Sequence, residues 1–233
     1  VNNATFDNIN TKPGSAMLEI NGGNPQINNS IFQNTNGNKS YYGINILNGA
    51  NPIISGNSFS NTNYPIYITT GDPVLSGNTA NDNLYNGIFF DAGYEVSDDV
   101  VLEKDLPYYV DSIIEIKNNA ILTINAGAEI RFNPFGAIGQ DGLEIKDGGV
   151  LQTIGEEGEE IKFTAAALSP LAGYWKGLYF LGDAGENSII NNVLIEYANI
   201  GIKVADGAPE IELDNIIFNE NNTDTNPADL LEL

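Results

Sequence analysis

A short pattern repeats along the first ninety residues of the chain, and it limits the possible folds more than any other feature. The segment Pro52–Asn57, with the sequence PIISGN, recurs at Pro73–Asn78 as PVLSGN, and a looser copy occupies Pro25–Ser30. Between these copies lie further alternating segments, whose isoleucines are spaced 22 residues apart: Ile44, Ile66 and Ile88. A fixed period of about 20 to 50 residues is typical of solenoids, propellers and other arrays. Each copy holds two short alternating strands and Asn or Gly turns, which indicates one coil of β-strands per repeat.

The rest of the chain keeps this strand-and-turn pattern, with one interruption. Residues 1–90 hold 21 asparagines, whereas residues 91–117 hold none. Residues 91–112 lack regular alternation and are interpreted as an irregular insertion, and a second set of alternating segments continues through residues 113–233. The sequence therefore predicts a single all-β domain over residues 1–233, folded as a parallel β-helix (a solenoid) of roughly nine or ten rungs.

Segments near the end of the chain resemble segments near its start. Asn191–Ile200 is similar to Asn2–Ile9, and Asn215–Asn219 is similar to Asn29–Asn34. One interpretation is that all rungs of such a fold look alike. The other is that the chain is one unit of a longer tandem array, in which open strand edges pair head to tail with another copy.

The charge of the chain excludes several partners. It has 31 acidic and nine basic residues, a formal net charge of −22. Nucleic acid and anionic membranes need clustered Lys and Arg, so neither is an expected partner. No apolar run approaches the roughly 18 residues that cross a bilayer, so membrane insertion is not expected. The chain has no cysteine for a disulfide or a thiolate metal site. An acidic surface of this kind suits an extracellular, cation-containing setting.

Three segments carry a family resemblance. Leu122–Ile130 reads LTINAGAEI, Trp175–Phe180 reads WKGLYF and Asn191–Ala198 reads NNVLIEYA. They resemble rungs of the right-handed parallel β-helix proteins of the pectin-lyase-like superfamily, in particular its bacterial and archaeal surface members. The resemblance covers nearly the whole chain apart from about residues 91–112. It implies a right-handed parallel β-helix, but function depends on a site and not on the fold.

The same resemblance indicates what an enzyme of this superfamily would need. Polygalacturonase relatives use clustered aspartates with Gly-His-Gly and Arg-x-Lys motifs, and pectate-lyase relatives use an Arg or Lys beside Ca²⁺-binding carboxylates. The chain has no histidine, and its one arginine, Arg131, has no acidic cluster of that kind close in sequence. Two carboxylates alone can hydrolyse a sugar, but the adjacent Asp98 and Asp99 would point to opposite faces of a strand. We therefore expect that the chain is not an enzyme.

Calcium is the one metal that the composition suggests, because carboxylate, amide and turn carbonyl oxygens are its preferred ligands. The candidate Ca²⁺ ligands are four acidic residues of the irregular segment: Asp91, Glu95, Asp98 and Asp99. A second acidic run, Glu156–Glu160, is interpreted as a charged turn. Neither group matches an EF-hand loop or the nonapeptide β-roll repeat. No cofactor is required by the sequence.

Aromatic residues in successive rungs provide candidate contacts for a polysaccharide or a partner protein. The candidates are Tyr41, Tyr64, Tyr67 and Trp175. Tyr67 alternates with Ile66 and Ile68, so its ring is expected to face outward. A row of rings on one face could hold a sugar chain or a protein. The alternative is a mixture of isolated surface rings and core rings.

These observations favour a structural or adhesive module of an extracellular or cell-surface protein. Its rungs would build a stiff acidic rod, with the chain itself, a cell-surface polysaccharide or a cell-surface protein as partner. End-to-end assembly into a filament or sheath is one form of this hypothesis. The alternative is a carbohydrate-binding module, or a polysaccharide lyase or hydrolase, of the same fold.

Overall fold

The structure is a computed structural model that describes residues 1–7, 9, 12–35, 40–133, 135 and 138–227. The described residues form strands joined by turns, with no helix among them, so the all-β prediction is confirmed. Accordingly, no helical segment capable of spanning a bilayer occurs in this part of the chain. The chain divides into two compact units. Unit 1 comprises Val1–Asp91 with Asp105–Tyr108, and unit 2 comprises Ala92–Lys104 with Tyr109–Leu233. All three points at which the chain passes from one unit to the other fall in the segment that the sequence marks as irregular.

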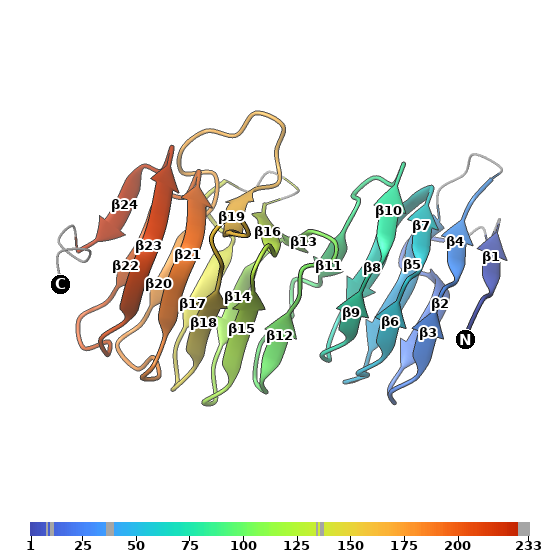
Figure 1. The fold of residues 1–233 in the computed structure, drawn as a ribbon, viewed down its shortest axis with the longest axis horizontal. Coiled ribbons are helices and arrows are strands. Elements are labelled where there is room, and N and C mark those ends of the chain that lie inside the picture. The colour runs from blue at the N-terminus through green and yellow to red at the C-terminus, as the bar shows by residue number, and fades with distance from the viewer. Residues whose placement is uncertain (8, 10–11, 36–39, 134, 136–137, 228–233) are drawn as a thin grey trace. The chain divides into compact units, whose positions relative to one another are not determined.

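Unit 1 consists of three stacks of parallel strands, each strand paired with the strand of the next rung (Figure 1). The first stack is β1 (Thr5–Asp7), β4 (Ile31–Gln33), β7 (Ser58–Ser60) and β10 (Thr79–Asn81). The second is β2 (Ala16–Asn21), β5 (Ser40–Leu47), β8 (Thr62–Ile68) and β11 (Ile88–Phe90). The third is β3 (Gln26–Asn28), β6 (Ile53–Ser55) and β9 (Val74–Ser76). The repeated segments of the sequence therefore occupy equivalent strands.

The isoleucines spaced by 22 residues form one inward row of unit 1. Ile44 pairs in register with Ile66, which pairs with Ile88, and the side chains of all three are fully buried. This arrangement confirms the predicted stacking of aliphatic side chains from rung to rung. Gly43, beside this row, has no room for a side chain, because an added Cβ would lie 2.5 Å from the carbonyl oxygen of Pro65.

Buried amides form a ladder along a turn of unit 1. The Asn57 Oδ1 atom accepts a hydrogen bond from the Ser30 N–H at 2.9 Å, and its Nδ2 group donates to the Ile27 carbonyl at 2.9 Å. The Asn78 Oδ1 atom accepts in the same way from the Asn57 N–H at 3.1 Å. Asp105 continues the ladder, accepting from the Asn78 backbone N–H at 2.8 Å and side-chain amide at 2.7 Å. Part of the segment interpreted as an insertion thus completes the regular pattern of unit 1.

Unit 2 also consists of parallel stacks (Figure 1). One stack is β12 (Val100–Leu102), β15 (Ile121–Asn125) and β18 (Val150–Ile154). A second is β13 (Tyr108–Val110, at the unit boundary), β16 (Glu129–Phe132) and β19 (Ile161–Ala165). The long strand β21 (Ile189–Glu196) pairs with both β18 and β19, and β23 (Glu212–Asn219) pairs with β21. The last stack is β14 (Ile113–Ile116), β17 (Gly142–Ile145), β20 (Gly177–Phe180), β22 (Ile200–Val204) and β24 (Thr223–Asn226).

Candidate functional site

An aromatic cluster lies on strands β5, β8 and β11 of unit 1 and on the bend before β11. Register pairing places Tyr42 beside Tyr64 and Tyr67 beside Phe89. Ring centroids are 4.4 Å apart between Tyr42 and Tyr67 and 4.7 Å apart between Tyr64 and Phe89. The members of the aromatic cluster are Tyr41, Tyr42, Tyr64, Tyr67, Tyr85 and Phe89. The sequence had indicated a row of rings here, and the structure brings Tyr41, Tyr64 and Tyr67 together.

The aromatic cluster is packed mainly against itself and is not an open platform. Tyr64 is 7% exposed and Phe89 is 2% exposed, while Tyr41 and Tyr67 are partly exposed. The Tyr67 hydroxyl donates to the Asp91 carboxylate at 2.5 Å. Burial, and then the hydrogen bond and charge of Asp91, raise the pKa of Tyr67 above its ordinary value. The prediction that Tyr64 is a surface contact is therefore wrong, because the neighbouring rings cover it.

Trp175 is a core residue of unit 2. Its side chain is fully buried and stacks on Phe132 with ring centroids 4.1 Å apart. The indole Nε1–H donates to the Glu196 carbonyl oxygen at 2.7 Å, which satisfies its one polar group. The prediction that Trp175 contacts a sugar or a partner is wrong, because its ring points inward onto the ring of a neighbouring strand.

Three of the four candidate calcium ligands contact different groups, and the fourth, Asp98, is exposed. Asp91 belongs to unit 1 and accepts the hydrogen bond from Tyr67. In unit 2, Glu95 forms an ion pair with Lys117 at 2.5 Å, Asp99 accepts from the Ile121 N–H at 2.9 Å, and Asp98 is exposed. Within the part of the chain that the structure describes, no three acidic side chains are grouped so as to hold a metal ion. The structure therefore does not assemble these four residues, or Glu156–Glu160, into a metal site.

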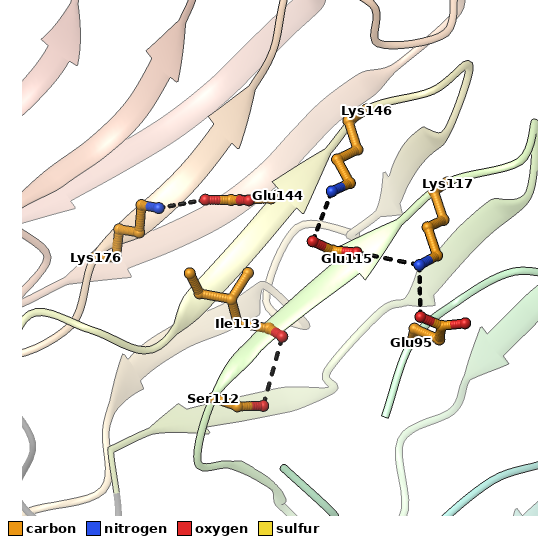
Figure 2. Close-up of polar contacts among 8 residues, drawn as sticks. All are labelled: Glu95, Ser112, Ile113, Glu115, Lys117, Glu144, Lys146 and Lys176. Atoms are coloured by element: carbon orange, nitrogen blue, oxygen red, sulfur yellow. Dashed lines mark hydrogen bonds and ion pairs between the residues drawn. The ribbon is translucent and has the colours of Figure 1, made fainter. Parts of the chain in front are cut away.

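Ion pairs cross from rung to rung on the outer face of β14 and β17 in unit 2, and Figure 2 shows them. Glu115 accepts from Lys117 at 3.2 Å and from Lys146 at 2.6 Å. Glu144, which is in register with Glu115 on the next strand, pairs with Lys176. Hydrogen bonds first from Lys146 and then from Lys117 lower the pKa of Glu115. We refer to Glu95, Lys117, Glu115, Lys146, Glu144 and Lys176 as the ion-pair ladder.

The one arginine of the chain is also held by its neighbours. The Arg131 guanidinium donates to both carboxylate oxygens of Glu129, at 3.0 and 3.1 Å, and to the Tyr109 hydroxyl at 3.0 Å. Its charge also lies 5.6 Å from the centre of the Tyr109 ring. Arg131 therefore has a structural role within unit 2, as a link between strands β13 and β16.

A pocket of about 760 Å³ in unit 2 contains acidic residues that the sequence reasoning did not identify. We call it the acidic pocket, and its polar lining residues are Asp111, Ser112, Gln140, Asp141 and Lys176. Ser112, Asp141 and Lys176 each directly precede a paired strand of the stack β14, β17 and β20. One signal in the sequence could have located these three residues. Each lies directly before an alternating strand, and the three strands belong to successive rungs.

Asp141 is the most unusual residue of the acidic pocket. It is 3% exposed, and its Oδ2 atom has no hydrogen-bond partner in the structure. Burial first, and then the charge of Asp111, raise the pKa of Asp141 to about 6. Burial also raises the pKa of Asp111. The buried Oδ1 atom of the adjoining Asn133 has no partner either. The acidic pocket thus contains the nearly buried Asp141 and the half-buried Asp111, each with a raised pKa.

Comparison with known families finds a match for each of two overlapping parts of the chain. Residues 1–105 match the family model of the right handed beta helix region. Residues 94–223 match the family model of the pectate-lyase like beta helix domain. Comparison with curated proteins and with solved structures finds no match to the chain.

Proposed function

The chain belongs to the family of pectate-lyase-like β-helix domains, and we propose that it is a non-catalytic structural module of an extracellular surface protein. Its two units act as stiff segments, and their exposed surfaces contact cell-surface polysaccharide or protein. Stiffness follows from parallel strands that pair with the next rung over many successive strands, so that no rung moves without its neighbours.

One observation carries this proposal: the basic side chains of unit 2 are used in contacts within the protein. The ion pairs engage the following residues: Lys104, Lys117, Arg131, Lys146, Lys162 and Lys176. A lyase needs a basic group that can take a proton from the sugar, and such a group has a lowered pKa. Hydrogen bonds that the two ammonium groups donate to carboxylates instead raise the pKa of Lys117 and of Lys146. This arrangement favours a structural role for these residues over a catalytic one.

The aromatic cluster supports the same proposal. Its rings fill space against one another, so Tyr42, Tyr64 and Phe89 contribute to the stability of unit 1 as a second apolar layer outside the inward rows. Burial of such rings stabilises a fold by about 25 cal/mol for each Å² of apolar surface removed from water. A surface built in this way is rigid and suits display or adhesion.

The proposal is tested first by an activity assay. The purified chain is incubated with acidic, neutral and amino-sugar polysaccharides from about pH 4 to pH 9, spanning the ordinary carboxyl and histidine range, with and without Ca²⁺. We expect no new reducing ends and no unsaturated uronic ends. Cleavage that follows the protein through purification would show that the chain is an enzyme and contradict the proposal.

A second experiment tests the location and the assembly of the module. Antibodies raised against the purified chain should label intact cells of its source without permeabilisation, and labelling only after permeabilisation would contradict an extracellular role. Light scattering over a range of protein concentrations separates a monomeric module from one that self-associates, because the mass of an assembling module rises with concentration.

A further inference from the structure

Two neighbouring loops of unit 2 carry a group of exposed apolar side chains. One loop joins β16 to β17, and the other joins β19 to β20. Both loops begin and end at paired strands, and the Gly139 N–H donates to the Tyr174 carbonyl oxygen at 3.0 Å, so the loops lie side by side. The loop after β19 extends well beyond the ends of the strands in Figure 1. We call the exposed apolar residues of the two loops the apolar loop residues: Phe135, Ile138, Leu168 and Leu171.

The apolar loop residues are unusually exposed for a folded chain. Leu168 is fully exposed, Leu171 is 77% exposed and Ile138 is 65% exposed. Among the residues that the structure describes, no other large apolar side chain is as exposed as these three. Phe135 adds an aromatic ring on the first of the two loops. A single exposed apolar side chain needs no explanation, but several together on adjoining loops indicate a contact site.

The same two loops lack charge. Residues 132–140 and 163–175 contain no charged side chain, although charged residues make up 17% of the chain. Of the charged residues that follow the two loops, Asp141 is buried and Lys176 pairs with Glu144. The centre of a protein interface is depleted of charged residues in the same way. The loops therefore offer an uncharged contact surface on a chain whose net charge is −22.

We propose that the apolar loop residues form the interface of a dimer, in which the same loops of a second copy of this chain cover them. An apolar surface is complementary to itself, and a two-fold axis is the commonest symmetry of such contacts. Two copies that each carry a charge of −22 repel one another, and this repulsion is weakest where the surface has no charge. Four side chains at these exposures present a few hundred Å², so two facing sets would bury on the order of 1,000 Å², the lower limit for a specific interface. The dimer should therefore be weak, and its population should rise with protein concentration.

A lipid surface is a less favourable occupant of the two loops. Membrane-binding segments combine apolar side chains with Lys or Arg residues that attract anionic lipid headgroups. Neither loop contains a basic residue, and the ammonium group of Lys176, which follows the second loop, is held by Glu144. Charge thus opposes binding to an anionic membrane and leaves a second copy as the favoured occupant.

Sedimentation velocity of the whole chain, over a range of protein concentrations at low and high salt, tests the inference. We expect a monomer–dimer equilibrium whose dissociation constant falls by about threefold or more between about 0.05 M and 0.5 M salt, because salt screens the repulsion between the acidic copies. A chain that stays monomeric up to about 1 mM in both salts would overturn the proposal. A dimer that salt weakens would overturn it as well, because ion pairs would then hold the copies together. Growth beyond the dimer would contradict the two-fold contact and indicate pairing at strand edges.

The double variant Leu168→Ser with Leu171→Ser locates the interface, and Leu84→Ser is its matched control. Leu84 is 56% exposed and belongs to unit 1, outside both loops. The double variant should raise the dissociation constant about tenfold or more, because it removes apolar contacts from both copies, whereas the control should leave the constant unchanged. Thermal unfolding of each variant shows that the fold is intact.

Two outcomes with these variants would overturn the proposal. Unchanged dimerisation in the double variant would place the interface elsewhere on the chain. Binding of the monomer to neutral phosphatidylcholine vesicles, lost in the double variant, would assign the two loops to a lipid surface instead. The dimer rests on the apolar loop residues and the proposed structural role on the paired basic side chains, so either can fail without the other.

Discussion

The two units stack the same kind of rung, but in unit 2 ion pairs contribute to the connections between neighbouring rungs. In unit 1 the connections are amides and rings: the Asn57–Asn78–Asp105 ladder, the aromatic cluster, and the stacked Phe6, Phe32 and Phe59 at 4.6 and 5.0 Å. Unit 2 has amide and ring connections as well, at Asn221 and between Phe132 and Trp175, and it adds ion pairs such as those of the ion-pair ladder. The comparison teaches that one backbone arrangement accepts two chemically different ways of joining its rungs.

The difference follows from how charge is distributed in the sequence. Of the nine basic residues, only Lys12 and Lys39 precede residue 91, so unit 1 has few cations with which to pair its acidic groups. Ion pairs at partly exposed positions weaken as salt is added, because mobile ions screen them within about 10 Å at 0.1 M. Buried hydrogen bonds of side-chain amides are not screened in this way. The stability of unit 1 should therefore depend little on salt, and the ladder of unit 2 should depend on it.

The largest effect is expected from breaking the amide ladder of unit 1 with Asn57→Ala. The substitution leaves the Ser30 N–H and the Ile27 carbonyl buried without their partner. At about 1 to 3 kcal/mol for each of these two groups, the free energy of unfolding should fall by about 2 to 6 kcal/mol. Urea titration measures the loss, and hydrogen exchange of peptides from each unit shows whether unit 1 alone loses protection.

The matched control for this prediction is Asn24→Ala, an exposed turn asparagine of the same unit. It should change the stability by less than about 0.5 kcal/mol. The loss in Asn57→Ala should also be equal at low and high salt. If both asparagine variants behave alike, the buried ladder is not what joins the rungs of unit 1.

Asp141→Asn tests a carboxylate of unit 2 that has no ion-pair partner, and it should stabilise the protein. The pKa of Asp141 is about 6 in the fold against an ordinary value of 3.8, so the folded state binds more protons between these pH values. Stability of the native chain therefore falls as the pH rises through this window. The variant avoids that loss. Its gain in the free energy of unfolding over the native chain should therefore be absent below about pH 4 and complete above about pH 6, where it is at most about 3 kcal/mol.

Urea titrations at about pH 4 and pH 7 measure this effect, with the exposed Asp206→Asn as control. A variant that is no more stable than the native chain at pH 7 would show that the charge of Asp141 is already compensated in the fold.

Much of the fold could be predicted from the sequence, because one period sets it. The spacing of Ile44, Ile66 and Ile88 identifies the inward row, since stacked rungs require equivalent residues at a constant interval. The irregular segment was harder, because Asp105 completes the amide ladder of unit 1 although it lies beyond a stretch that belongs to unit 2. Nothing local in the sequence marks a residue that returns to an earlier unit.

The candidate site was less predictable, because it depends on which face each side chain occupies. Alternation correctly placed Tyr67 outside the inward row, but it could not show that Tyr64 is covered by other rings. Trp175 follows a turn, where alternation gives no direction, and its ring points inward. Asp111 and Asp141 are 30 residues apart in the sequence, and only the pairing of β14 with β17 brings their turns together.

A smaller effect is expected from Tyr67→Phe, which tests the polar edge of the aromatic cluster. The variant keeps the ring contacts and removes the hydroxyl, which donates to Asp91 and also shares a hydrogen bond with the Tyr42 side chain. Asp91 is partly exposed and can be hydrated instead, so the loss should be about 1 kcal/mol. The double variant Tyr67→Phe with Asp91→Asn should lose little more than the single one, because both changes remove the same contact. Fully additive losses in urea titrations would show that the two side chains act separately.

The smallest effect, and the one that bears most directly on the comparison, is expected from Glu115→Gln in unit 2. Glu115 is bonded to Lys117 and Lys146, but its side chain is 32% exposed, so solvent screens both pairs. The expected loss at low salt is therefore only about 0.5 to 1 kcal/mol, and it should shrink towards zero at about 1 M salt. The pKa of Glu115 is lowered in the fold, so its contribution is present above its ordinary pKa and disappears as the pH falls through the lowered value. Glu157→Gln, at an exposed turn position of the same unit, is the control and should show neither dependence. An equal loss in Glu115→Gln at low and high salt would contradict the prediction. Packing and hydrogen bonding would then join the rungs of unit 2 as they join those of unit 1. The units would differ in residue type but not in the salt dependence of their stability.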